Sequence, residues 1–149
     1  MHKKLSLSVG TLKAAAILTL IKLFFSALQL IILLFAINGL DRFLLNNSQL
    51  LEKTLLLAPE FAQMIAISMG HVPQILMQNI TLVIAMAVLY GVLSIAIKRI
   101  KKNDSIKKWA MITLVISAIA ISGRDFLLLA IGVLGMISGT NILILTEEK

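Results

Sequence analysis

The sequence predicts an all-α fold of the integral membrane class: a four-helix bundle with an extracytoplasmic helical segment between its first two spans. Hydrophobic residues make up 59% of the 149 residues and the mean hydropathy is +1.00, whereas soluble domains are roughly half apolar. Charged residues make up 14%, against about 25% in soluble domains. A chain of this length forms one domain, and in water it could not bury so much apolar surface. A lipid bilayer is therefore the expected solvent.

Apolar stretches long enough to cross a bilayer predict four spans, since a spanning helix needs about 20 apolar residues. The N-terminal stretch is too long for the apolar region of a signal peptide and contains Lys22, so we interpret it as a retained membrane helix. The third stretch is short, and it suffices only if Lys108 and Arg124 extend to the two headgroup regions. The predicted spans cover about residues 17–40, 80–97, 109–122 and 126–145.

The stretch "SGRD", residues 122–125, separates the third and fourth spans. Its glycine suits a tight turn, and its two charged residues favour an interface over hydrocarbon. The alternative is one long kinked helix, but ~37 residues at 1.5 Å per residue would overshoot a bilayer. The sequence therefore predicts a helical hairpin.

The segment between the first two spans, residues 41–79, predicts two short helices. The first begins at Ser48, a suitable N-cap, and runs toward Leu57. The second has Pro59 at its first position and ends at Gly70, in keeping with the preference for proline at helix starts and glycine at helix ends. Whether residues 54–72 lie on the outer membrane face, re-enter the membrane or span it is not decided by this segment alone.

The distribution of basic residues favours four spans over five. We call residues 97–108, "IKRIKKNDSIKK", the basic loop; it holds six of the fourteen basic residues. With four spans and both termini in the cytoplasm, the outer side carries only Arg42, Lys53 and Arg124. A fifth span would place the basic loop outside, against the positive-inside rule. The inner side carries ten basic residues: Lys3, Lys4, Lys13, Lys98, Arg99, Lys101, Lys102, Lys107, Lys108 and Lys149.

A polar stripe runs along one face of the first span. Its members are spaced three, four and three residues apart, which places them on one side of a helix: Thr19, Lys22, Ser26 and Gln29. Either Lys22 extends to the inner interface while the neutral residues bond across helices, or the stripe lines a polar site or contacts a partner. Since the last span descends toward the cytoplasm, we expect Lys22 near Asn141 or the terminal acids, Glu147 and Glu148.

The last span contains small residues at helix-packing spacing. Gly135 and Gly139 form a GxxxG pattern, and Gly132 lies one turn earlier. Small residues let helix backbones approach closely in lipid. Packing within the chain is the favoured interpretation, and dimerisation is the alternative.

The sequence contains no pattern typical of catalysis, metal binding or cofactor binding. It lacks cysteine, HExxH, Walker and GxSxG motifs, and its two histidines, His2 and His71, are isolated. Apart from Lys22, the predicted spans hold no charged side chain, whereas active sites usually gather several ionisable groups. The net charge of +7 has almost no aromatic interleaving, so it predicts membrane topology and not nucleic-acid binding.

The stretch "LYGVLSIAIKRIKKNDSIKKWAMITLVISAIAISGRDFLLLAIGVLGMISG" carries a resemblance. A span ending in a basic loop, followed by a hairpin whose second helix is rich in glycine, resembles small four-span membrane proteins of unknown function from Gram-positive bacteria. The resemblance covers about the last two-fifths of the chain. It implies no activity and assigns no functional residue.

These features predict a non-enzymatic protein of the bacterial inner membrane. Its expected partners are the lipid bilayer and either another membrane protein or further copies of the chain, in the role of an accessory subunit. One alternative is an immunity protein against a bacteriocin or toxin, or an envelope-stress protein. Another is a small transporter or channel subunit, for which the stripe from Thr19 to Gln29 would have to line an inward polar path.

Overall fold

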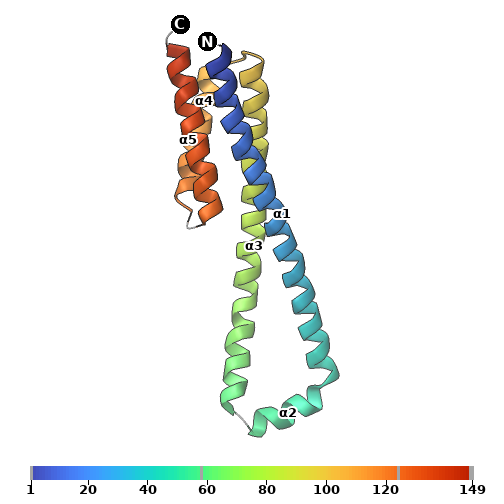
Figure 1. Cartoon of the computed structure of the whole chain (residues 1–149). Coiled ribbons are helices and arrows are strands. Elements are labelled where there is room, and N and C mark those ends of the chain that lie inside the picture. Colours follow the sequence, from blue (N-terminus) through green and yellow to red (C-terminus); the bar gives the residue numbers. More distant parts are fainter. Residues whose placement is uncertain (1, 58, 124, 148–149) are drawn as a thin grey trace. The chain divides into compact units, whose positions relative to one another are not determined.

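A computed structural model of the chain describes the backbone of residues 2–57, 59–123 and 125–147, and most of their side chains. Five helices account for nearly all of these residues (Figure 1), so the all-α prediction is confirmed. Arg124 and Lys149, which the charge argument uses, lie outside the described residues. The helices are α1 (His2–Asn46), α2 (Ser48–Leu57), α3 (Pro59–Lys101), α4 (Ile106–Ile121) and α5 (Phe126–Glu147).

The chain divides into two compact units. The bundle unit comprises Met1–Phe24 and Ile84–Lys149, and thus the start of α1, the end of α3, and all of α4 and α5. The α2 unit comprises Phe25–Val83, with the remainder of α1, α2 and the start of α3.

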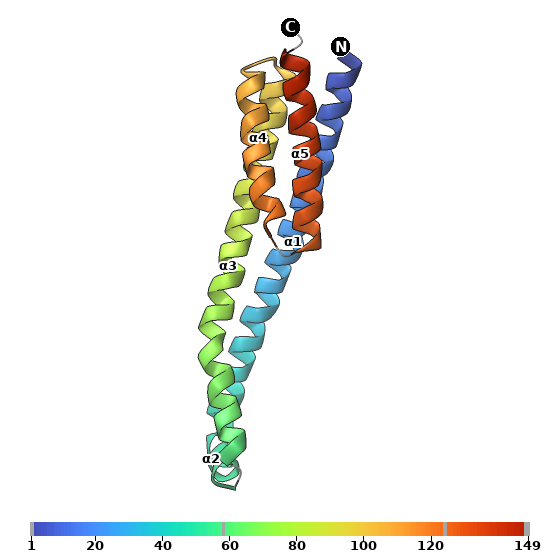
Figure 2. The same cartoon turned by 90° about the vertical axis from the view of Figure 1, so that its left-hand side faces the viewer.

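In the bundle unit, α1 and α5 run antiparallel and are joined at two levels. The Ser138 hydroxyl donates a buried hydrogen bond of 2.6 Å to the Ser8 carbonyl, and Lys22 pairs with Asp125. The two contacts are 14 residues apart on α1 and 13 apart on α5, which is about 20 Å on both helices at 1.5 Å per residue. The start of α1 and the end of α5 consequently lie at the same end of the unit (Figures 1 and 2).

The core of the bundle unit consists of apolar and small side chains from all four of its helical segments. Leu12 on α1, Leu93 and Ile100 on α3, and Ile131 and Ile142 on α5 are almost completely buried. α4 contributes a stripe of small buried residues with spacings of three, four and three: Ala110, Thr113, Ser117 and Ala120. Small side chains on α4 leave room for the backbone of α5.

Glycines of α5 occupy that room. A Cβ atom added to Gly132 would lie 2.7 Å from the Ser117 carbonyl oxygen, and one added to Gly135 would lie 2.0 Å from the Ser117 hydroxyl. One added to Gly139 would lie 3.2 Å from the Ala110 carbonyl oxygen. The three glycines thus face α4 of the same chain, and this close contact allows dispersion attraction along the whole α4–α5 seam.

The link between α3 and α4 is a tight turn within the basic loop. Asn103 and Ser105 adopt left-handed backbone conformations with φ of 56° and 52°. Arg99 donates a hydrogen bond to the Asp104 carboxylate, and the Asp104 N–H bonds the Arg99 carbonyl at 3.0 Å. This Arg99 contact, together with Ser105, lowers the pKa of Asp104 below its ordinary value.

The α2 unit leaves large apolar side chains exposed. On α1, Phe35 is 74% exposed and Leu45 is 77% exposed. Other exposed apolar residues of the unit include Phe25, Ile32, Phe43, Leu56, Ile67 and Met77. So many exposed large apolar side chains are unusual on soluble monomers and are typical of contact with lipid or protein.

Among the residues that the structure describes, three helices contain segments long and apolar enough to cross a membrane: Leu5–Asn46, Met69–Lys101 and Phe126–Glu147. α4 has 16 residues, about 24 Å, and falls below that length. The segments Leu5–Asn46 and Met69–Lys101 extend well beyond the predicted spans at residues 17–40 and 80–97. The predicted spans stop where charged or polar residues interrupt the apolar sequence, but such residues do not end a helix.

The predicted helix boundary at Gly70 is wrong. α2 covers Ser48–Leu57 as expected and α3 begins at Pro59, but α3 continues through Gly70 and Pro73 to Lys101. Glycine costs a helix only about 1 kcal/mol relative to alanine. Pro73 removes one helical hydrogen bond, and apolar helices tolerate such a loss when neighbouring groups compensate. The long apolar sequence after Pro73 favours a continuous helix, so neither Gly70 nor Pro73 ends it.

Candidate functional site: an ion pair at the start of α5

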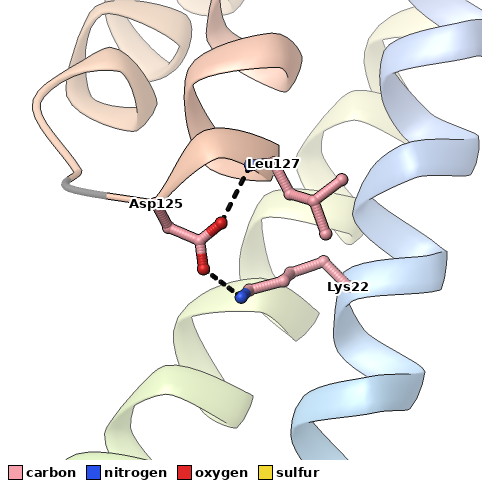
Figure 3. Close-up of polar contacts among 3 residues, drawn as sticks. All are labelled: Lys22, Asp125 and Leu127. Carbon is pink, nitrogen blue, oxygen red and sulfur yellow. Dashed lines mark hydrogen bonds and ion pairs between the residues drawn. The ribbon is translucent and has the colours of Figure 1, made fainter.

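Lys22, in the middle of the apolar sequence of α1, forms an ion pair with Asp125 (Figure 3). Its amine donates a hydrogen bond to Oδ2 of Asp125, a residue 103 positions further along the chain. The Lys22 side chain is 15% exposed and that of Asp125 is 38% exposed. The pair is therefore partly shielded from solvent, and each charge satisfies the other.

Asp125 also shapes the start of α5. Its second oxygen, Oδ1, accepts a hydrogen bond of 2.8 Å from the Leu127 N–H (Figure 3). This is the contact an N-cap aspartate makes with the second residue of a helix, where backbone N–H groups lack helical partners. The negative charge also lies at the positive end of the helix dipole. The Asp125 carboxylate thus caps the start of α5 and also binds Lys22 of α1.

The ion pair changes the chemistry of the carboxyl group. The hydrogen bond from Lys22 is the largest cause that lowers the pKa of Asp125 below its ordinary value. The Leu127 N–H acts in the same direction, while partial burial opposes it. Asp125 is consequently held in its charged form, which suits a structural ion pair and not an exchange of protons near neutral pH.

The expectation that Lys22 lies near Asn141 or the terminal acids is wrong. Asn141 is exposed and lies 16 residues beyond Asp125 on α5, about 24 Å along the helix. Glu147 contacts Lys107 at 3.8 Å, and Glu148 lies outside the described residues. The error came from assigning Lys22 to the cytoplasmic end of its span. The antiparallel register of α1 and α5 instead places it at the turn that precedes α5.

The predicted polar stripe does not form a continuous polar path in the described structure. The Thr19 hydroxyl is buried but donates to the Ala15 carbonyl of its own helix at 2.8 Å. Ser26 is also buried, whereas Gln29 is exposed. Of the stripe, Lys22 makes the contact that joins distant parts of the chain. Threonine hydroxyls commonly bond the carbonyl four residues earlier in their own helix, which explains Thr19.

No cluster of three or more His, Cys, Asp or Glu side chains that could hold a metal ion occurs among the residues whose placement is described. The described ion pairs are Lys22–Asp125, Arg99–Asp104 and Lys107–Glu147. Two of the three lie on or beside the basic loop.

Sequence reasoning missed Asp125 as the partner of Lys22, although a signal for it existed. Asp125 is the single acid between residues 105 and 146, and it lies beside an apolar stretch that also had to pack against α1. An unpaired charge in an apolar setting is costly, so opposite charges beside packed apolar helices are expected to find one another. What the sequence lacked was the register between the two helices.

No family model, curated protein or solved structure matches this chain. The resemblance to small four-span membrane proteins stays a prediction.

Proposed function

We propose that the chain is a non-enzymatic four-span protein of the bacterial inner membrane that acts as an accessory subunit by binding another membrane protein. The observation that carries the proposal is the length and apolarity of α1 and α3. They have 45 and 43 residues, about 65 Å each, whereas crossing the hydrocarbon takes about 30 Å. About half of each helix is thus left over, and it too exposes large apolar residues.

The proposed membrane arrangement follows from the bundle unit. α5 has 22 residues, about 33 Å, which matches the hydrocarbon thickness. α4 has 16 residues, and it crosses the hydrocarbon if the charged side chains at its two ends extend to the headgroup regions. With the basic loop at the inner leaflet, the turn between α4 and α5 lies at the outer interface, and Asp125 holds Lys22 there. Both termini are then cytoplasmic.

Site-specific photo-crosslinking in intact cells tests partner binding. A photoreactive amino acid is placed in turn at Ile31, Ile32, Phe35 and Phe43 of α1, which are exposed in the α2 unit, and at Ile119 of α4 as a control on the bundle unit. The proposal predicts one adduct of constant mass at the α1 positions that share a helical face, and none at Ile119. Adducts of scattered mass, or none on α1, would contradict it. An adduct whose mass follows the tag of a second, tagged copy identifies the partner as the chain itself.

A further inference from the structure

A cavity of about 480 Å³ lies within the bundle unit, at the end that carries the basic loop. Its lining comes from the start of α1, the junction of α3 and α4, and the last turn of α5. Ligand-binding pockets commonly measure about 300 to 1,000 Å³, so this cavity can hold a small group or part of a larger molecule.

Two lysines are among the residues that line this cavity. Lys13 of α1 and Lys101 of α3 come from different helices and lie close enough for their like charges to repel each other. No acidic residue occurs among the described residues of the lining. Two described acids near this end of the unit have other partners, since Asp104 pairs with Arg99 and Glu147 contacts Lys107.

The remaining lining includes both polar and apolar side chains. Ser6 and Asn103 add groups that can donate hydrogen bonds, while Leu5 and Leu145 add apolar surface. Adjacent ammonium groups repel each other, and an anion between them relieves that repulsion and gains charge-assisted hydrogen bonds. A ligand that matches both kinds of lining residue carries a negative group on an apolar chain.

We propose that this cavity binds a phosphate group, held by Lys13 and Lys101, with the apolar chain of an anionic phospholipid against the apolar residues of its lining. The inference rests on the membrane insertion proposed above, but it does not depend on a protein partner. Anionic lipids of the cytoplasmic leaflet lie at the level of the basic loop in that arrangement. The cavity distinguishes this site from the general attraction of a basic surface, because it lies between helices and is limited in volume.

Binding is tested with purified full-length protein in mild detergent, by native mass spectrometry and thermal unfolding with added phosphatidylglycerol. The test variant is Lys13→Gln/Lys101→Gln. The matched control is Lys98→Gln/Lys108→Gln, which removes the same charge from the same end without touching the lining. Because the test variant loses two charge-assisted hydrogen bonds to the bound phosphate, it is expected to bind roughly a hundredfold more weakly. The control is expected to stay within a few-fold of the natural chain.

Two further variants distinguish a loss of lipid binding from misfolding. Lys13→Arg/Lys101→Arg keeps both charges and is expected to retain binding. Ser6→Phe keeps both lysines and fills the cavity, and it is expected to lose bound lipid. The Gln/Gln variant should unfold at or above the temperature of the natural chain without lipid, because it lacks the repulsion between the two amines. Equal lipid binding by the natural chain and the Gln/Gln variant would overturn the proposal, as would unchanged binding in Ser6→Phe.

The source of the phosphate is assigned by competition. If inorganic phosphate or glycerophosphoglycerol at millimolar concentration displaces the lipid and raises the unfolding temperature alone, the site takes soluble phosphates, and the phosphate site itself is supported. If neither competes, the apolar chain is required and the ligand is a lipid. Fractionation of cell membranes tests membrane insertion separately. If alkaline extraction releases the chain from the membrane fraction, the proposed membrane arrangement is wrong. The measured phosphate binding would not be changed by that result.

Discussion

Lys22 on α1 and Asp125 at the start of α5 form an ion pair across 103 residues of sequence. The pair joins the first helix of the chain to its last hairpin, and the hydrogen bond between Ser138 and Ser8 joins them again about 20 Å away. Two fixed points on two antiparallel helices define their register. These two polar contacts supplement the buried apolar core of the bundle unit and the small-residue packing between α4 and α5.

The ion pair is expected to make a modest, measurable contribution to stability. Lys22→Met and Asp125→Asn, alone and combined, form a double-mutant cycle in which the coupling free energy is the quantity of interest. Because Asp125 is 38% exposed, solvent screens the pair, and we expect a coupling of about 1 kcal/mol. Thermal or denaturant unfolding in mild detergent measures it. Asparagine keeps the capping contact to Leu127, so the cycle isolates the charge. A coupling of zero would show that the pair does not hold α1 to α5.

The same pair predicts a dependence of stability on pH. The pKa of Asp125 is lowered in the folded state, chiefly by Lys22, so its contribution is present above the ordinary carboxyl pKa of about 3.9. That contribution is lost as the pH falls through the lower, folded-state pKa. The natural chain should therefore lose more stability than Asp125→Asn when the pH falls from 7 to 3. Parallel melting curves for the two proteins, with an equal decrease, would count against the ion pair.

The α4–α5 seam predicts a sharp difference between glycines. Gly132→Ala places a methyl group 2.7 Å from the Ser117 carbonyl and 2.9 Å from the Ile121 backbone nitrogen, neither of which can rotate away. Overpacking of this kind costs about 1 to 3 kcal/mol. Gly10→Ala on α1 is the control, since nothing lies within 4 Å of its added Cβ. Alanine there should stabilise the helix by about 0.5 to 1 kcal/mol. If both substitutions shift the unfolding temperature in the same direction, the seam is not packed as described.

Ser138→Ala removes the buried hydrogen bond between α5 and α1. Interhelical hydrogen bonds in membrane proteins average about 0.6 kcal/mol and reach about 1.7. Since this bond is buried and 2.6 Å long, we expect a loss in the upper part of that range. Ser122→Ala serves as the control, because the Ser122 hydroxyl is exposed and bonds the Ile119 carbonyl of its own helix. Equal losses from the two substitutions in the same unfolding assay would show that the bond to Ser8 adds nothing.

The sequence predicted the helices better than their contacts. Apolar length and the caps at Ser48 and Pro59 located α2 and the start of α3, because those signals are local. The end predicted at Gly70 failed because the apolar residues beyond Pro73 outweigh a weak local preference.

The candidate site could be predicted only in part. Lys22 was identified because a lysine within apolar sequence is unusual, and the glycines of α5 because their spacing suits close packing. The partner Asp125 and the convergence of Lys13 with Lys101 depend on the register between helices far apart in sequence. No local pattern encodes that register, since it depends on contacts between helices far apart in sequence, such as the Ser138–Ser8 hydrogen bond.

In the proposed arrangement, the α4–α5 hairpin crosses the membrane with its turn outside and the basic loop inside. The chain contains no cysteine, so single cysteines report position without interference. Ser122→Cys and Lys102→Cys are treated in intact cells with a membrane-impermeant maleimide. We expect labelling at position 122, and labelling at position 102 only after the cells are opened. Labelling of position 102 in intact cells, or protection of position 122 until lysis, would contradict this arrangement.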